Sequence, residues 1–413
     1  MKKILITVGY KKREYGYLRL LKKFVSKKGF DVRIRYMNFE CYHEVFSWKP
    51  DFVMLSQVNQ SENIEFAKYA KRTGAIVLVL NAELLFTDSS IRLKYDRDCN
   101  NYVDFTIEWG SMNKLDLLTR VSHLNREKIK ILGAPKFDLY MRSEENTHQD
   151  LLPYTGRLNK SKKTVCFCTS FDYWNASWEW VKDNVGYKEG GKKAFDFLVQ
   201  TNKQMARDYV VTAKQLARTN KYNIIFRNHP LEDPEFYLSE LKNVKNIIFD
   251  NKVSQKSLFR VVDLIVHRSS TIAVEAWIYN IRTVTFDPIN DSRSELFSFT
   301  RLERIFHSRG PLLDYIHRSL HLKRKPYNFM SHKKYLMEEF GFVRNGKSTS
   351  SERIANFLET VPLKKKQFAI HLYVMYFYIL SIAKLVLFRK YIYEVIGLFK
   401  GKTYLTIMRD NYI

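Results

Sequence analysis

The feature of this sequence that most constrains its fold is an alternation of short apolar runs with amphipathic segments, repeated along two parts of the chain. In the first part, the run Ile4–Val8 is followed by a helical pattern over Tyr17–Phe24. Strands that alternate with helices form βαβ units, whose strands lie parallel in one sheet. The other elements expected in this part are strands at Val32–Met37, Phe52–Leu55, Ala75–Leu80, Phe105–Trp109 and Ile129–Leu132, and a helix at Ile64–Tyr69 that ends at Gly74.

The second part repeats this pattern after a charged stretch that contains proline and glycine. This stretch, Arg142–Lys163, is typical of a domain boundary. Beyond it we expect strands at Thr164–Cys168, Tyr222–Phe226, Ile247–Phe249, Leu264–Val266 and Thr283–Phe286, and helices at Phe195–Arg218, Leu258–Val262 and Thr271–Tyr279. The sequence thus predicts an α/β protein with two Rossmann-like domains, over residues 1–150 and 160–345, that face each other across a central cleft.

The chain is strongly basic: its 413 residues include 69 Lys and Arg against 43 Asp and Glu, a formal net charge of +26. A field of this sign attracts nucleic acid, anionic lipid or phosphorylated small molecules. The basic residues are spread over the whole chain without a recognisable nucleic-acid module, so we expect no nucleic acid partner. The absence of a P-loop, a complete G-x-G-x-x-G and an H-E-x-x-H removes the commonest ATPases, dehydrogenases and metalloproteases. The four cysteines are expected to be reduced, packed residues of a cytosolic protein.

The turn Arg227-Asn228-His229-Pro230 follows directly on an expected buried strand. In doubly wound sheets ligands bind at the carboxyl ends of the strands, which is where this Arg and His emerge. A histidine beside an arginine offers donors to a phosphate group. The alternative is a surface turn whose histidine only hydrogen-bonds to the backbone.

A second polar motif, His267–Thr271, bridges an expected strand and an expected helix. Its hydroxyl residues are typical of helix N-caps, and helix N-termini bind anions. Glu275 lies one turn inside the helix, where it is a candidate acceptor for ribose hydroxyls or, alternatively, the partner of a hydroxyl in a capping box. The candidate donor-binding residues of this motif are His267, Arg268, Ser269, Ser270, Thr271 and Glu275.

The order of several motifs resembles a known group of enzymes. The Arg-x-His-Pro turn and the later Ser269–Ala276 resemble paired motifs of bacterial GT-B glycosyltransferases with cytidine-nucleotide donors, which include sialyl- and polysialyltransferases, Kdo transferases and CDP-glycerol glycerophosphotransferases. More closely, Asn81–Glu83, Gly133–Asp138 and Thr164–Phe171 are similar to successive landmarks of bacterial surface carbohydrate biosynthesis proteins, over roughly the first 290 residues. That family usually has glycine after the N-terminal Glu, whereas Leu84 stands here, so the acceptor loop is expected to differ.

The resemblance implies a GT-B transferase without a cofactor, in which the C-terminal domain holds a nucleotide-activated donor. The N-terminal domain then presents a glycan or lipid-linked acceptor and the catalytic base, for which Glu83 is the candidate. Arg227, His229 and Arg268 would stabilise charge on the departing nucleotide. No Asp-x-Asp stands at a strand end, which predicts a reaction without metal. The alternative bases are Asp88, Glu108 and Asp172.

Three functions follow from these motifs. The first is a glycosyltransferase of capsule- or lipopolysaccharide-type surface polysaccharide biosynthesis that transfers an acidic CMP-activated sugar, such as Kdo or a sialic-acid relative. The second is a CDP-glycerol-type polyol-phosphate transferase, which needs the same phosphate-binding turn. The third is a non-enzymatic polyanion-binding protein, which the spread of the charge disfavours.

The C-terminal stretch, residues 364–413, has a membrane signature. Lys364–Lys366 precede the aromatic-rich apolar run Phe368–Phe388, and Arg389 follows it. A histidine, a serine and a lysine interrupt the run, which is more typical of a helix lying in the membrane interface than of a span; a buried helix hairpin is the other alternative. We therefore expect a helical membrane-associating tail that holds a cytoplasmic enzyme on the inner face of the anionic cell membrane.

Overall fold

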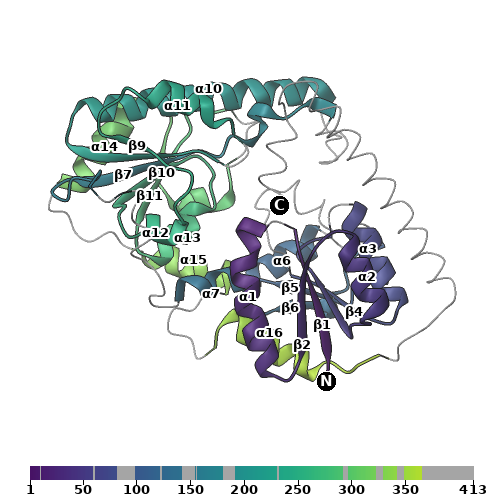
Figure 1. Ribbon diagram of the computed structural model, residues 1–413. Helices are drawn as coiled ribbons and strands as arrows, with labels where there is room; N and C mark the ends of the chain where they lie inside the picture. Colours follow the sequence, from purple (N-terminus) through teal and green to yellow (C-terminus); the bar gives the residue numbers. More distant parts are fainter. Residues whose placement is uncertain are drawn as a thin grey trace. The chain divides into compact units, whose positions relative to one another are not determined.

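The computed structural model divides into two units, each with its own sheet and core (Figure 1). Unit 1 comprises residues up to 142 together with those from Tyr335 on, and unit 2 comprises residues 143–334. The structure describes residues 1–9, 11–58, 61–80, 98–120, 123–141, 154, 156–179, 191–229, 232–291, 296–321, 329–341 and 348–364.

Unit 1 contains a parallel six-stranded sheet in the order β2-β1-β3-β4-β5-β6. This is the flavodoxin-like strand order of a doubly wound sheet. The side on which successive strands are added changes between β1 and β3, and this is the switch point of the sheet. Its strands are β1 (Lys3–Val8), β2 (Asp31–Tyr36), β3 (Phe52–Leu55), β4 (Ile76–Val79), β5 (Phe105–Glu108) and β6 (Ile129–Ile131).

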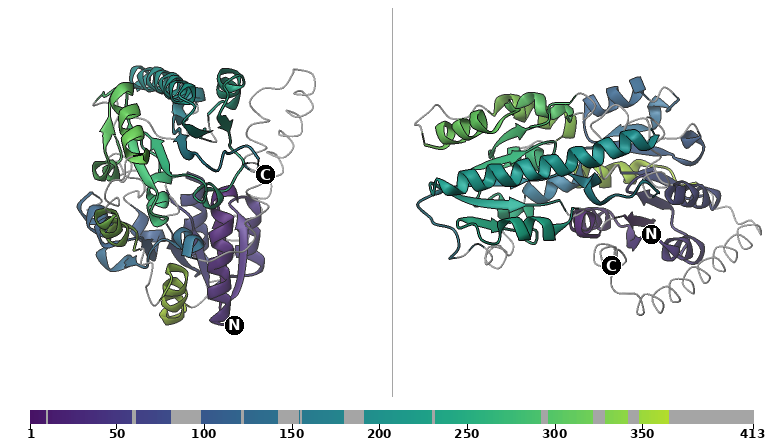
Figure 2. Two further views of the ribbon diagram at one scale, coloured as in Figure 1. Left: turned by 90° about the vertical axis from the view of Figure 1, so that its left-hand side faces the viewer. Right: turned by 90° about the horizontal axis from the view of Figure 1, so that it is seen from above.

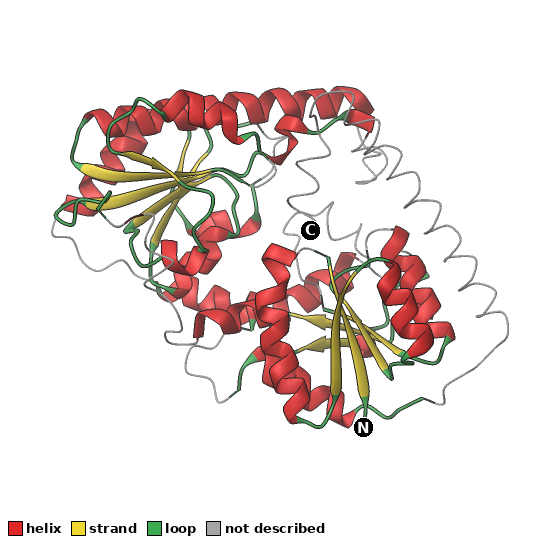
Figure 3. Ribbon diagram, in the orientation of Figure 1, coloured by secondary structure: helices red, strands yellow, loops and turns green. Residues whose placement is uncertain are grey.

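Helices cover both faces of this sheet, because alternate residues of its strands point to opposite sides (Figure 3). Ile4 of β1 packs in a core with helices α1 and α16, whereas Leu5 packs in a second core with α2 and α3. The helical segments with described residues in this unit are α1 (Lys11–Lys27), α2 (Phe39–Ser47), α3 (Ser61–Arg72), α5 (Cys99–Tyr102), α6 (Ser111–Arg120), η1 (Arg126–Lys128), α7 (Pro135–Met141) and α16 (Ser350–Thr360).

The chain returns to unit 1 at its C-terminal end. Asp138 of α7 accepts hydrogen bonds from the backbone N–H groups of Ser350 (3.0 Å) and Ser351 (2.7 Å), which fixes the start of α16. Helix α15 (Met330–Phe340) carries the chain between the units, and a Cβ on Gly110 would lie 2.0 Å from the carbonyl oxygen of Glu338 in this helix. The expected second domain ended at residue 345, but the contacts place residues from Tyr335 on with unit 1.

Unit 2 contains a parallel six-stranded sheet in the order β12-β11-β10-β7-β8-β9. Counted along the chain and read from the β9 edge, this is the 3-2-1-4-5-6 order of Rossmann folds, with its switch point between β7 and β10. The strands are β7 (Lys163–Cys168), β8 (Tyr222–Arg227), β9 (Ile247–Phe249), β10 (Leu264–His267), β11 (Arg282–Phe286) and β12 (Ile305–Phe306).

The long helix α10 (Gly191–Arg218) runs along one face of this sheet (Figure 2). Met205 and Tyr209 of α10 pack with Val165, Ile224 and other strand residues in one buried core. The remaining helical segments described here are η3 (Asp172–Asn175), α11 (Pro234–Leu241), α12 (Gln255–Leu258), α13 (Ile272–Ile278), η4 (Ser298–Leu302) and α14 (Arg309–His321).

The expected strands are confirmed, and each strand end agrees with its expected position to within one residue. The helix expected over Leu258–Val262 is wrong, because Ser254 caps α12 by accepting the N–H of Ser257 at 3.2 Å and this short helix ends at Leu258. All four cysteines are buried free thiols. The apolar run Phe368–Phe388 lies outside the described residues. Among the residues that the structure describes, no helix combines the length and apolar character needed to cross a membrane.

Candidate functional site

The two predicted motifs lie at one edge of the sheet of unit 2. Parallel strands end at a common edge, and His229 follows β8 while Ser270 follows β10. Strand β7 lies between β8 and β10, so Ser170, just after β7, stands between the two motifs. This edge contains the switch point, where open α/β sheets bind their ligands.

Arg227, the last residue of β8, is held by an acidic partner. Its Nη1 donates to Asp250 Oδ2 at 3.0 Å and to the carbonyl oxygen of Val253 at 2.7 Å. The same carboxylate accepts the hydroxyl of Tyr154 at 2.6 Å. Because the guanidinium side chain is only 18 % exposed, Arg227 mainly ties β8 to the loop after β9.

His229 is partly exposed and is positioned through its backbone. Its N–H donates to Thr169 Oγ1 at 3.2 Å, and its carbonyl oxygen accepts the Asn228 side-chain amide at 2.9 Å. The amide oxygen of Asn228 is buried without a hydrogen-bond partner in the described part of the chain. A buried acceptor of this kind is rare in proteins, so the turn offers an unused acceptor directly beside the histidine.

Glu232, which the sequence analysis missed, anchors this turn from below. Its buried carboxylate accepts the Thr169 hydroxyl at 2.7 Å, the Phe171 N–H at 2.6 Å and the hydroxyl of Tyr237. Burial and this carboxylate together raise the pKa of Tyr237 well above its ordinary value. These hydrogen bonds hold the ends of β7 and β8 together, beside Ser170.

His267, at the end of β10, is fully buried in the described structure. Its Nε2 lies 2.9 Å from Glu303 Oε2, and neither side chain has exposed surface. Its Nδ1 accepts the N–H of Ser270 at 3.3 Å, so the ring shapes the loop that carries the hydroxyls. Burial raises the pKa of Glu303. The interactions with His267 and two threonine hydroxyls lower it by more, so that the pKa lies below its ordinary value.

Arg268 and Ser269 are also buried. Arg268 Nε donates to Asp287 Oδ1 at 2.9 Å, in a pair whose side chains are 9 % and 5 % exposed. Ser269 Oγ accepts the N–H of Phe297 at 3.0 Å, so this hydroxyl serves the fold. Of the predicted hydroxyls, those of Ser270 and Thr271 belong to partly exposed residues.

Glu275 is buried inside α13, so a ribose contact would need a rearrangement of its surroundings. The alternative capping box with Thr271 is not formed either, because the Thr271 side chain makes no capping hydrogen bond and its backbone is helical. Helix α13 has only seven residues.

The candidate catalytic bases come from both units. Glu83 and Asp88 lie outside the described residues. Glu108, at the end of β5 in unit 1, is buried and accepts the Thr106 hydroxyl at 2.7 Å. Asp172 begins the short helix η3 after β7. Within the described ranges, no group of three or more His, Cys, Asp or Glu side chains is arranged to hold a metal ion.

The structure therefore separates the predicted residues into two layers. The partly exposed residues are His229, Ser270 and Thr271, together with Ser170. Arg227 is mostly covered. Beneath them, Arg227, His267 and Arg268 each contact a carboxylate of the described chain. Two of these carboxylates could be predicted from the sequence as residues of this sheet edge, because Asp250 directly follows β9 and Asp287 directly follows β11.

Comparisons with known proteins support the fold. No protein-family model and no curated protein matches the chain. Among solved structures, a UDP-GlcNAc 2-epimerase from Methanocaldococcus jannaschii in complex with UDP-GlcNAc and UDP is similar with a TM-score of 0.57 and 16 % identity, over 86 % of this chain and 99 % of that one. S. aureus MnaA bound to UDP is similar with a TM-score of 0.56 and 14 % identity, over 89 % of this chain and all of that one.

A third similar structure has a different activity in its name. The wall teichoic acid polymerase TagF, as a variant soaked with CDPG, matches with a TM-score of 0.53 and 12 % identity, over 86 % of this chain and 88 % of that one. At these identities the likeness shows a shared two-domain GT-B-type architecture.

Proposed function

We propose that this protein is an enzyme of surface carbohydrate biosynthesis that transfers a group from a nucleotide-activated donor bound by unit 2. The observation that carries this proposal is the meeting of accessible polar side chains at the switch point of a Rossmann-ordered sheet. Similar structures contain UDP-GlcNAc, UDP or CDPG, which supports a nucleotide-linked ligand at a fold of this kind.

The roles of the residues follow from their positions. His229, Ser270 and Thr271 donate hydrogen bonds to the donor phosphates, and Ser170 lies within the same edge. As the bond to the transferred group breaks, negative charge grows on the departing nucleotide, and donors fixed in advance stabilise this charge most. The buried layer provides that fixation, because His267 orients the Ser270 loop and Glu232 orients the His229 turn.

Two donor classes remain in competition. A CMP-activated acidic sugar is our first candidate from the sequence motifs, and a CDP-glycerol-type donor is the second, favoured by the similarity to TagF soaked with CDPG. Both share a cytidine nucleotide. The acceptor is proposed to be a lipid-linked or free glycan, with Glu83 as the base and the tail beyond Lys364 resting on an anionic membrane.

The proposal is tested by nucleotide release from a panel of CMP-sugars, CDP-glycerol and UDP-GlcNAc, with and without EDTA. We expect release of CMP that requires His229 and persists in EDTA. His321→Ala is a matched control, because His321 contacts the ring of Tyr222 at the opposite end of β8. Conversion of UDP-GlcNAc to its 2-epimer without group transfer would refute the transferase, and no nucleotide binding by any assay would refute the donor site.

A further inference from the structure

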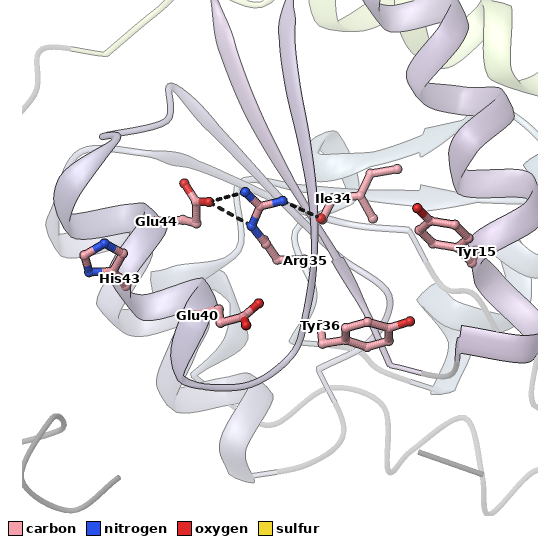
Figure 4. A pocket seen from close by; sticks show the side chains of 7 residues that line it. All are labelled: Tyr15, Ile34, Arg35, Tyr36, Glu40, His43 and Glu44. Atoms are coloured by element: carbon pink, nitrogen blue, oxygen red, sulfur yellow. Dashed lines mark hydrogen bonds and ion pairs between the residues drawn. The ribbon is translucent and has the colours of Figure 1, made fainter. Parts of the chain in front are cut away.

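A pocket of about 670 Å³ lies in unit 1, and none of its lining residues belongs to the proposed donor site (Figure 4). It sits at the carboxyl end of the edge strand β2, between the start of α1 and helix α2. Its volume falls within the range of small-molecule sites. Neither the sequence motifs nor the proposed reaction gives this pocket a role.

One wall of the pocket is a fixed polar group. Arg35 donates to Glu44 Oε1 from Nε at 2.8 Å and from Nη2 at 2.7 Å, and its Nη1 donates to the carbonyl oxygen of Ile34 at 3.1 Å. Arg33 Nη1 binds the other oxygen of Glu44 at 2.6 Å and its guanidinium lies over the ring of Trp48. The wall is thus ordered before any ligand arrives, which reduces the entropy lost on binding.

The opposite wall carries two aromatic side chains. Tyr15 and Tyr36 lie on the side of the pocket away from Glu44 and His43 (Figure 4). Tyr15 is 40 % exposed although it is a large apolar side chain. A tyrosine offers an apolar ring face together with a hydroxyl. Sugars present C–H faces and hydroxyls in the same way, so this combination suits a saccharide ring.

The charge of the lining argues against a phosphorylated ligand. Among the described lining residues, the guanidinium of Arg35 is paired with Glu44, which also binds Arg33, and Glu40 adds a second carboxylate. A phosphate group would meet these carboxylates at close range, whereas neutral hydroxyls both donate to carboxylates and accept from a guanidinium. The pocket therefore selects a neutral polar ligand over a nucleotide.

We propose that this pocket binds a neutral saccharide unit of the acceptor glycan, at a distance from the reacting end. This inference rests on the proposed transferase function. Strand β2 neighbours β1 in the sheet, and the pocket opens at the same edge as the end of β4, after which the candidate base Glu83 follows. An extended acceptor lying along this edge would place one sugar in the pocket and another towards the end of β4.

The test uses the full-length protein and saturation-transfer NMR with the methyl glycosides of glucose, galactose, mannose, N-acetylglucosamine and glucuronic acid. We expect transfer to at least one neutral glycoside and weaker transfer to the glucuronide. Tyr15→Ala should lower the affinity about tenfold through the lost ring contact. Tyr36→Phe, which removes only a hydroxyl that is buried in this structure, should lower it less. Leu115→Ala, which changes an exposed side chain on α6 outside the pocket, is the control and should leave binding unchanged.

CMP binding, measured in the same samples, separates this inference from the proposed function. If no neutral glycoside receives saturation, or if Tyr15→Ala binds as the parent does, the saccharide pocket is refuted even when CMP binds. If Tyr15→Ala abolishes CMP binding, the pocket is a nucleotide site and the inference is wrong. If glycosides bind and no nucleotide does, the pocket stands and the donor site fails.

Discussion

Replacing Glu303 should show that the conformation of the loop that carries Ser270 depends on a buried carboxylate. The carboxylate accepts hydrogen bonds from His267 and from the hydroxyls of Thr283 and Thr285, the last at 2.6 Å. Thr283 also accepts the indole N–H of Trp277 at 2.6 Å, so the network reaches from β10 to α13. Removing the acceptor leaves several buried donors without a partner.

The size of the effect depends on what replaces the carboxylate. Breaking a fully buried pair by removing one partner destabilises a protein by about 3–5 kcal/mol. For Glu303→Leu this corresponds to a fall of about 6–20 °C in the Tm of a domain of this size. Glu303→Gln keeps an acceptor oxygen, so we expect about 1–2 kcal/mol from one weakened hydrogen bond.

Differential scanning calorimetry of the full chain measures the transition of unit 2 in each variant. Nucleotide titration at a temperature where Glu303→Gln is folded then measures donor binding by the loop that carries Ser270. The Ser270 N–H donates to His267 Nδ1 at 3.3 Å. We expect weaker donor binding in Glu303→Gln. A Glu303→Leu protein whose Tm lies within about 2 °C of the parent, which is less than 1 kcal/mol, would refute the reasoning.

Three further outcomes are expected. Because the pKa of Glu303 is depressed in the folded state, its stabilisation is present above its ordinary value of 4.5 and is lost as pH falls through the lower folded value; the difference in Tm between the parent and Glu303→Gln should therefore shrink on acidification below pH 4.5. Ser270→Ala should reduce nucleotide release with little change in Tm, whereas Ser269→Ala should lower the stability by about 1 kcal/mol, because its hydroxyl accepts the Phe297 N–H; the reverse pattern would contradict the two layers of the site. A chain that ends at Lys364 keeps every described residue, so it should retain its Tm and cease to sediment with anionic vesicles, while continued sedimentation would show that the tail is not the anchor.

The strands were predictable because their signal is local. A strand buried on both faces of a parallel sheet is a continuous apolar run, and Phe52–Leu55, which is buried throughout, matches its expected bounds. The expected start of α12 was too late because Leu258, Phe259 and Val262 are all buried and resemble a helical face. Only the capping Ser254 marks where this helix begins.

The sheet edge that carries the candidate residues was predictable, but the division between accessible and buried residues was not. Polar residues after a strand indicate the carboxyl edge, which placed His229 and Ser270 correctly in one unit. Whether a basic residue reaches a ligand depends on its acidic partner, and those partners are remote. Asp287 is 19 residues from Arg268, and Glu303 is 36 residues from His267.

Asp287 offers a way to learn whether Arg268 acts on the donor through its charge. The pair is almost fully buried, so Asp287→Asn removes the carboxylate that accepts from the guanidinium at 2.9 Å, and we expect a loss of about 3–5 kcal/mol. A donor phosphate nearby would replace that negative charge. Since a ligand stabilises the state that it binds most tightly, saturating nucleotide should raise the Tm of Asp287→Asn by more than it raises the parent's.

A second variant separates the effect of the Arg268 charge from the effect of the loop conformation. Arg268→Gln disturbs the same buried pair but leaves no cation, so its Tm should gain less from nucleotide than that of Asp287→Asn. If both variants gain equally, the nucleotide only restores the shape of the loop, and Arg268 is a positioning residue. If neither gains as much as the parent, the pair at the end of β11 is needed to form the donor site at all, because breaking it from either side then weakens binding.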